Sequence, residues 1–279
     1  MAAITDMDTV INRLTGGNSG TPVRYNAFKN DKIAGAASSA AVAARVQSLW
    51  RADGTPAGAA TPTTVLAPDN TTAGGLLQAD PGGGRNKYLI SGGVASSHCC
   101  TLTVYDRLLQ IGGFSGTLTT DQLVGGAITR FTSSTTSIGN QMFVEINTAI
   151  GATARTLTVT YLDEGGNTST STCVIGGTGY NEQNRMIPVP LATGDVGVTG
   201  ITKVAIDVST GTAGNFGMVI ARPLMTMGTG TSGCCDYANL LYTGGGPAEI
   251  TDACIAYMYT TNSTVVPWYT QIWLQTIEV

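Results

Sequence analysis

The residues with the clearest capacity for chemistry lie in the segment SSHCCT (residues 96–101), which holds the single histidine of the chain beside two of its six cysteines. A second adjacent pair follows at Cys234 and Cys235. Thiolate and imidazole groups are typical zinc ligands, and paired thiols can also form disulfides. The segment therefore raises three possibilities: a metal site, a disulfide framework, or ordinary thiols.

The spacing of these residues argues against a metal. In a β-strand, neighbouring side chains point to opposite faces, so Cys99 and Cys100 cannot both turn towards one ion. Neither cysteine pair has the C-x2-C spacing of a zinc-binding turn. Cys100 is in phase with Leu102 and Val104, which predicts that Cys100 is buried and Cys99 faces the other way. We expect no metal, no cofactor, and reduced buried thiols, with a disulfide at Cys235 as the alternative.

No catalytic motif accompanies these residues. His98 could act as a base in a hydrolase, but no G-x-S-x-G elbow or similar nucleophile motif is present, so a turn histidine is expected. The PGGGR segment (residues 81–85) lacks the pattern of a phosphate-binding loop, and DEGGN (residues 163–167) lacks EF-hand spacing, which favours a hairpin turn over a calcium site. The remaining acids are interpreted as solvated turn residues: Asp106, Asp121, Glu145, Asp195, Asp207, Asp236, Glu249 and Asp252.

Composition limits the partners of the chain. Charged residues are 11% of the 279 residues, against roughly 25% in typical globular proteins. With 14 Lys and Arg against 18 Asp and Glu, no basic patch for nucleic acid is evident. No window approaches the roughly 18 apolar residues of a membrane span, and the first residues lack a secretory signal pattern. We expect neither nucleic acid nor membrane as a partner, and folding in a cytoplasm.

The first 84 residues are predicted to form a helical and extended arm. One short helix is expected over residues 5–15 and a second over residues 33–50, each with an apolar stripe. Residues 52–84 are rich in proline and glycine without periodicity, which is typical of an extended segment whose partners lie on neighbouring subunits. The stripes are expected to make assembly contacts through Val10, Ile11, Leu14, Val42, Val46 and Trp50.

Beyond Arg85 the hydrophobic pattern changes to period two. Leu157, Val159 and Tyr161 alternate with threonines, and the turn at residues 164–167 leads into a second strand rich in Thr and Ser. This pattern predicts an all-β fold, a jelly-roll-like β-sandwich preceded by the helical and extended arm. We divide the chain into the arm (1–84), the sandwich (85–225) and a C-terminal β segment (226–279). Strands are predicted at residues 87–91, 99–111, 141–149, 155–161, 186–191, 201–208, 216–224, 255–260 and 268–278.

Three phrases carry a family resemblance: YDRLLQIGGFSGTLTT (residues 105–120), YLDEGGNTSTSTCVIGGTGYNEQNRMIPVPLATGDVGV (161–198) and STGTAGNFGMVIARPL (209–224). They resemble the virion structural proteins of tailed bacteriophages, over residues 49–224. The resemblance implies a non-enzymatic β-sandwich on the virion, assembled in the bacterial host cytoplasm. Such a protein would bind other capsid proteins and copies of itself, with a trimer as the expected oligomer. The long arm and the lack of fibre-like repeats favour a head decoration (cement) or minor capsid protein.

Two other classes of protein remain open. One is a tail or receptor-binding module that binds a glycan, and the other is a hydrolase that uses His98. The glycan surface would use aromatic side chains, although packing in a core or a subunit interface is the more common role of such residues. The aromatic candidates are Tyr161, Trp268, Tyr269 and Trp273.

Overall fold

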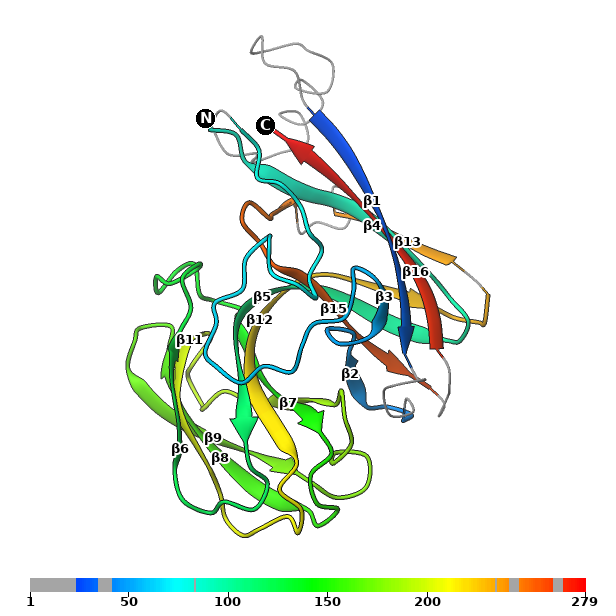
Figure 1. Ribbon diagram of the computed structural model, residues 1–279. Helices are drawn as coiled ribbons and strands as arrows, with labels where there is room; N and C mark the ends of the chain where they lie inside the picture. Colours follow the sequence, from blue (N-terminus) through cyan, green and yellow to red (C-terminus); the bar gives the residue numbers. More distant parts are fainter. Residues whose placement is uncertain (1–23, 35–41, 83, 234, 241–245, 263–267) are drawn as a thin grey trace.

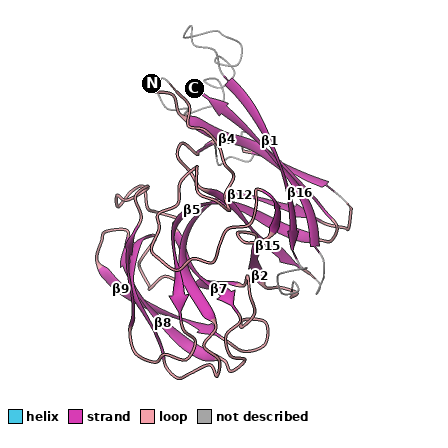
Figure 2. Cartoon of the chain, in the orientation of Figure 1, coloured by secondary structure: helices cyan, strands magenta, loops and turns pink. Residues whose placement is uncertain are grey.

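The computed structural model describes residues 24–34, 42–82, 84–233, 235–240, 246–262 and 268–279. These residues form strands, turns and loops, and no helix occurs among them (Figure 1, Figure 2). The strands pair antiparallel in three sheets, two of six strands and one of four. The predicted all-β class is confirmed for this part of the chain.

The eight strands β5 to β12 are paired in a nested order. β5 pairs with β12, β6 with β11, β7 with β10, and β8 with β9. The first of the eight strands thus pairs with the last, the second with the second to last, and so on inward to the central pair. This is the strand order of a jelly roll, in which a long hairpin is rolled into two facing sheets. The strands are β5 (Cys100–Phe114), β6 (Gln122–Ala127), β7 (Gln141–Thr148), β8 (Arg155–Asp163), β9 (Thr168–Ile175), β10 (Met186–Val189), β11 (Val198–Ile206) and β12 (Asn215–Thr229).

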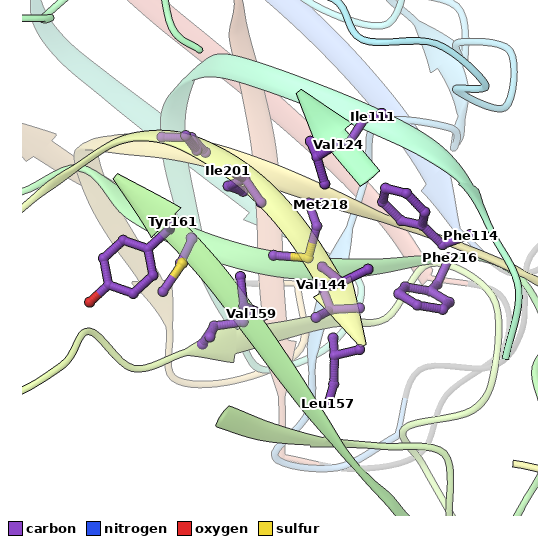
Figure 3. Packing of buried hydrophobic residues seen from close by; sticks show 14 of the residues in the cluster. Ile111, Phe114, Val124, Val144, Leu157, Val159, Tyr161, Ile201, Phe216 and Met218 are labelled. Carbon is purple, nitrogen blue, oxygen red and sulfur yellow. The ribbon is translucent and has the colours of Figure 1, made fainter. Parts of the chain in front are cut away.

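The core of this jelly roll contains side chains from both of its sheets (Figure 3). Leu157, Val159 and Tyr161 on β8 are buried in it, while the threonines between them face outward, which confirms the period-two prediction for this strand. On the facing sheet, the rings of Phe114 and Phe216 pack in a tilted arrangement with their centroids 5.5 Å apart. Alternating burial of this kind is what fixes the strand register.

A second layer lies against the far halves of β5 and β12. Their first and last residues, such as Leu102 and Met227, share a core with side chains of a further six-stranded sheet. That sheet has the order β13-β4-β16-β1-β3, with β14 also paired to β4, while β15 and β2 extend the sheet of β5. The strands are β1 (Arg24–Ala34), β2 (Val46–Ser48), β3 (Asp53–Thr55), β4 (Lys87–Ser96), β13 (Cys235–Asn239), β14 (Ala248–Glu249), β15 (Ile255–Thr261) and β16 (Trp268–Glu278).

The helix predicted over residues 33–50 is wrong for the part of this range that the structure describes, and residues 35–41 lie outside it. Ile33 and Ala34 end β1, and Val46–Ser48 form β2, which pairs with β15. At these positions, pairing with strands distant in sequence overrides the weak local preference for a helix. The helix predicted over residues 5–15 lies outside the described residues.

The predicted strand positions agree with the structure for every strand expected beyond residue 85. The three-part division of the chain stays a prediction. Strand pairings nevertheless connect its parts, because β1 pairs with β16 along its whole length and β12 continues through Met225.

Residues 46–80, which we call the strap, contain the short strands β2 and β3 and contact β5 near Gln110 and Gly112. Its residues from 52 onward have little regular structure, as predicted, but they are fixed to their own subunit: Leu76 is buried, and Leu66 forms a β-bridge with Gln110. The carbonyl oxygen of Pro62 approaches Gly112 so closely that a Cβ there would lie 2.1 Å from it. Only glycine fits at this point of the sheet.

Candidate assembly surface

The residues predicted to make assembly contacts do not form one surface. Val42 and Val46 are half-buried, and Val46 packs against a core cluster of the same chain. Trp50 is 1% exposed, so no surface of its side chain is left for a neighbour. Their role between subunits stays a prediction, and so does that of the remaining three residues, which lie outside the described part of the chain: Val10, Ile11 and Leu14.

Trp50 contributes to a buried polar cluster between the strap and the jelly roll. The Arg107 guanidinium lies 4.4 Å from the centroid of the Trp50 ring. Its Nη2 donates to Glu145 Oε2 at 2.5 Å, its Nε to Gln110 Oε1 at 2.8 Å, and its Nη1 to the Tyr105 hydroxyl at 3.3 Å. Burial acts to lower the pKa of Arg107, but the Glu145 carboxylate and Tyr105 raise it above its usual value. Arg107 is therefore a permanent buried cation with matched partners.

The interpretation of Asp106 and Glu145 as solvated turn residues is wrong. Both lie inside strands and are buried. Asp106 accepts a hydrogen bond from Arg130 Nη2 at 2.7 Å and from the Cys254 backbone N–H at 2.9 Å. The sequence did contain a signal, because each acid interrupts an apolar run, where an unpaired charge would be costly.

Lys32 is a second buried cation. Its Nζ donates to the backbone carbonyls of Pro56 at 2.5 Å and Ala52 at 3.2 Å, which holds the start of the strap against β1. Burial lowers the pKa of Lys32 from 10.5 to about 8, with Asp53 acting in the opposite direction. The folded protein therefore loses this proton at a lower pH than the unfolded chain does.

This shift predicts a pH-dependent stability. Between pH 8 and 10.5 the unfolded chain binds the Lys32 proton and the folded protein does not, so the Lys32 contribution to the free energy of unfolding should rise with pH, by ~3 kcal/mol in total. Lys32→Met should remove this rise. Urea unfolding of both proteins across that range measures the difference, and parallel pH profiles for the two proteins would contradict the prediction.

The faces predicted for the first cysteine pair are confirmed. Cys100 is buried, whereas Cys99 is half-buried and its thiol contacts the Gly230 carbonyl oxygen at 2.9 Å. Cys254 is also a buried free thiol, and burial raises its pKa to about 12. Cys235 is a free thiol but is exposed, so burial was predicted wrongly for it. Cys234 lies outside the described residues.

His98 lies in the bend between β4 and β5, as predicted, with its Nδ1 2.8 Å from the Ser97 hydroxyl. The DEGGN segment forms the β8–β9 turn, in which the Asn167 backbone N–H donates to Asp163 Oδ1 at 2.8 Å. Within the described ranges, no three His, Cys, Asp or Glu side chains come together in a way that could hold a metal ion. Those ranges also contain no helix with the length and apolar character to cross a membrane.

The clearest candidate surface is the outer face of the four-stranded sheet β6-β11-β8-β9, which we call the threonine face. The β8–β9 register places Thr158 opposite Thr172 and Thr160 opposite Thr170, all pointing away from the core. β11 adds Lys203 to this face, paired with Asp121 at 2.7 Å. Other members are Thr156, Thr168, Val174 and Leu123. A nearly uncharged face of short hydroxyl side chains can enter a contact without the desolvation cost of charges.

The predicted aromatic residues are separated. Tyr161 is buried in the jelly-roll core, where its hydroxyl donates to Asp195 Oδ2 at 2.5 Å. Tyr269 and Trp273 lie on the other layer, on the outward face of β16. Nothing of the Trp268 side chain is described. A single surface containing Tyr161 together with the residues of β16 is therefore ruled out.

Comparison with known proteins adds little. No family model and no curated protein match the chain. Among solved structures, infectious bursal disease virus of the Gt strain is similar at 9% identity and a TM-score of 0.19, covering 96% of this chain and 86% of that chain. The VP2 subviral particle of the same virus is similar at 9% identity and a TM-score of 0.21, covering 92% and 80%. These TM-scores are too low to indicate a shared fold.

Proposed function

We propose that this chain is a non-enzymatic structural protein of a bacteriophage particle. In this proposal it is a head decoration (cement) or minor capsid protein that binds the capsid surface and self-associates, with a trimer as the expected oligomer. It would be assembled in the host cytoplasm and reside on the virion. The phrases shared with tailed-phage virion proteins support the proposal, as does the jelly-roll strand order, which occurs in viral capsid proteins as well as in lectins.

The observation that carries the proposal is the threonine face, because fold alone does not establish function. Threonines such as Thr158 and Thr170 are short and restricted in χ1, so little side-chain entropy is lost when they are covered. The face is carried by a sheet whose other side is anchored in the jelly-roll core. Such a surface suits a permanent contact with a capsid lattice or with another copy of the chain.

Charge introduced on the threonine face should weaken binding to particles. Thr158→Lys with Thr170→Lys would place two cations in the contact, and we expect at least about a tenfold loss of affinity, which corresponds to ~1.4 kcal/mol. The measurement is co-sedimentation of the purified protein with phage heads that lack it. Sedimentation velocity of the free protein reports self-association in the same variants.

The matched control places the same charges on exposed loop threonines, Thr119→Lys with Thr132→Lys. This variant should bind like the unmodified protein. Equal binding by all three proteins would show that the threonine face is not the contact. Failure of the unmodified protein to bind any heads, together with its absence from purified particles by mass spectrometry, would overturn the proposed function itself.

A further inference from the structure

The outer face of the second layer carries an aromatic cluster that the sequence does not reveal as one unit. Tyr237 on β13 and Trp273 on β16 are both in register with Gly93 on β4, which lies between them. A Cβ at Gly93 would lie 2.2 Å from Trp273 Cε2, so the indole lies directly over this glycine. Tyr269 lies four residues before Trp273 on the same face, ~13 Å away along the strand. Tyr237 and Tyr269 are 51% and 50% exposed.

Amide side chains alternate with these rings. Gln271 and Gln275 occupy the outward positions of β16 on either side of Trp273. Gln275 Oε1 accepts hydrogen bonds from the Ser91 hydroxyl at 2.5 Å and from the Tyr237 hydroxyl at 3.2 Å. These two bonds fix the amide plane and use only its oxygen. The Nε2 donors of Gln275 are not needed for them and can be offered to a ligand.

The cluster leads into a pocket at the end of the sheet. The pocket has a volume of about 380 Å³. Tyr269 and Gln271 line it, so the pocket and the aromatic face are continuous. Its wall is mostly apolar surface, and the other lining residues come from β1, β4 and β16 and from the adjoining loops: Asp31, Lys32, Ala95, Ser96, Ser97, Gly233 and Thr270.

From this arrangement we propose that the outer face of the β13-β4-β16-β1 sheet binds a neutral oligosaccharide, with the chain of sugars lying over Tyr237, Trp273 and Tyr269 and one end in the pocket. Sugar rings present C–H faces that pack on aromatic rings and hydroxyls that pair with amides, the two kinds of group found here. Tyr237, Tyr269, Gln271, Trp273 and Gln275 carry no charge, and the pocket adds the carboxylate of Asp31, which is in register with Gln271. This arrangement disfavours polyanions such as nucleic acid.

This inference does not depend on the proposed function, because the threonine face belongs to a different sheet. A virion protein held through the threonine face would leave the aromatic face free to contact cell-surface polysaccharide. Binding to heads and binding to sugars should therefore be lost in different variants.

The test uses the full chain and a panel of short neutral oligosaccharides of glucose, galactose and mannose, with a sialylated oligosaccharide as the charged comparison. Indole N–H resonances in ¹⁵N–¹H NMR spectra report binding, and the Trp273 resonance is assigned by its loss in Trp273→Ala. We expect at least one neutral probe to shift the Trp273 resonance and leave that of Trp50 unchanged. Trp273→Ala should weaken binding of that probe at least about tenfold, measured by isothermal titration calorimetry.

Tyr269→Ala provides a second variant at an exposed position, where folding is not at risk, and it should also weaken binding. Thr170→Ala on the threonine face should bind the probe normally. The inference is overturned if no neutral probe binds, if the sialylated probe binds better, or if Tyr269→Ala binds sugar normally. It is equally overturned if Tyr269→Ala loses attachment to heads, because the aromatic face would then be a protein contact.

Discussion

Replacement of Glu145 by alanine is expected to lower the free energy of unfolding by ~3–5 kcal/mol, because it leaves the buried Arg107 cation without its carboxylate. The cost arises from the remaining charge and not from the lost bond alone. The double variant Arg107→Met with Glu145→Leu should recover part of the loss, since it removes both charges and keeps apolar volume. Urea unfolding at pH 7 measures all three proteins.

The matched control is Asp121→Ala. Asp121 pairs with Lys203 at the same kind of distance, 2.7 Å, but the two side chains are 51% and 41% exposed. Water compensates for the loss of such a pair, so the cost should be ~1 kcal/mol or less. If Glu145→Ala lowers the free energy of unfolding by no more than Asp121→Ala does, the buried ion pair is no more important for stability than an exposed one.

Trp50→Ala is expected to cost ~3–5 kcal/mol and to release the strap. The substitution opens a cavity beside Arg107 and removes the ring that covers its guanidinium. Limited proteolysis should then cut within residues 52–64, where the unmodified protein resists. Leu123→Ala is the control, because Leu123 is 77% exposed and should change stability by no more than ~0.5 kcal/mol. Equal cleavage of the Trp50 and Leu123 variants would show that Trp50 does not anchor the strap.

Much of the jelly roll was predictable because its strands carry their own signal. Alternation at residues 157–161 marks a strand buried on one face, whereas apolar residues at both even and odd positions of residues 104–111 mark a strand buried on both. β1 was missed because its sequence, RYNAFKNDKIA, is polar and its partner β16 lies at the other end of the printed chain. Pairing between distant segments leaves no local pattern.

The candidate surfaces were less accessible to sequence reasoning. Alternation in the sequence predicts that the β8 threonines point outward. It does not predict that Lys203 and Leu123 lie on the same face, because that depends on the order of strands in the sheet. Tyr237 was overlooked because it lies in a glycine-rich stretch without strand periodicity. Its position opposite Trp273 across Gly93 is set by two strand registers that no single segment encodes.

Strands β5 and β12 run through both layers, and this continuity has a mechanical consequence. Their ladder extends from Phe114 and Phe216 in one core to Cys100 and Thr229 in the other. A load applied to either layer is carried into the other through the covalent chain of both strands and the ladder of hydrogen bonds that joins them. The two paired strands therefore behave mechanically as one element. If one binding partner pulled on the jelly roll and another pulled on the second layer, both forces would act on the β5–β12 pair.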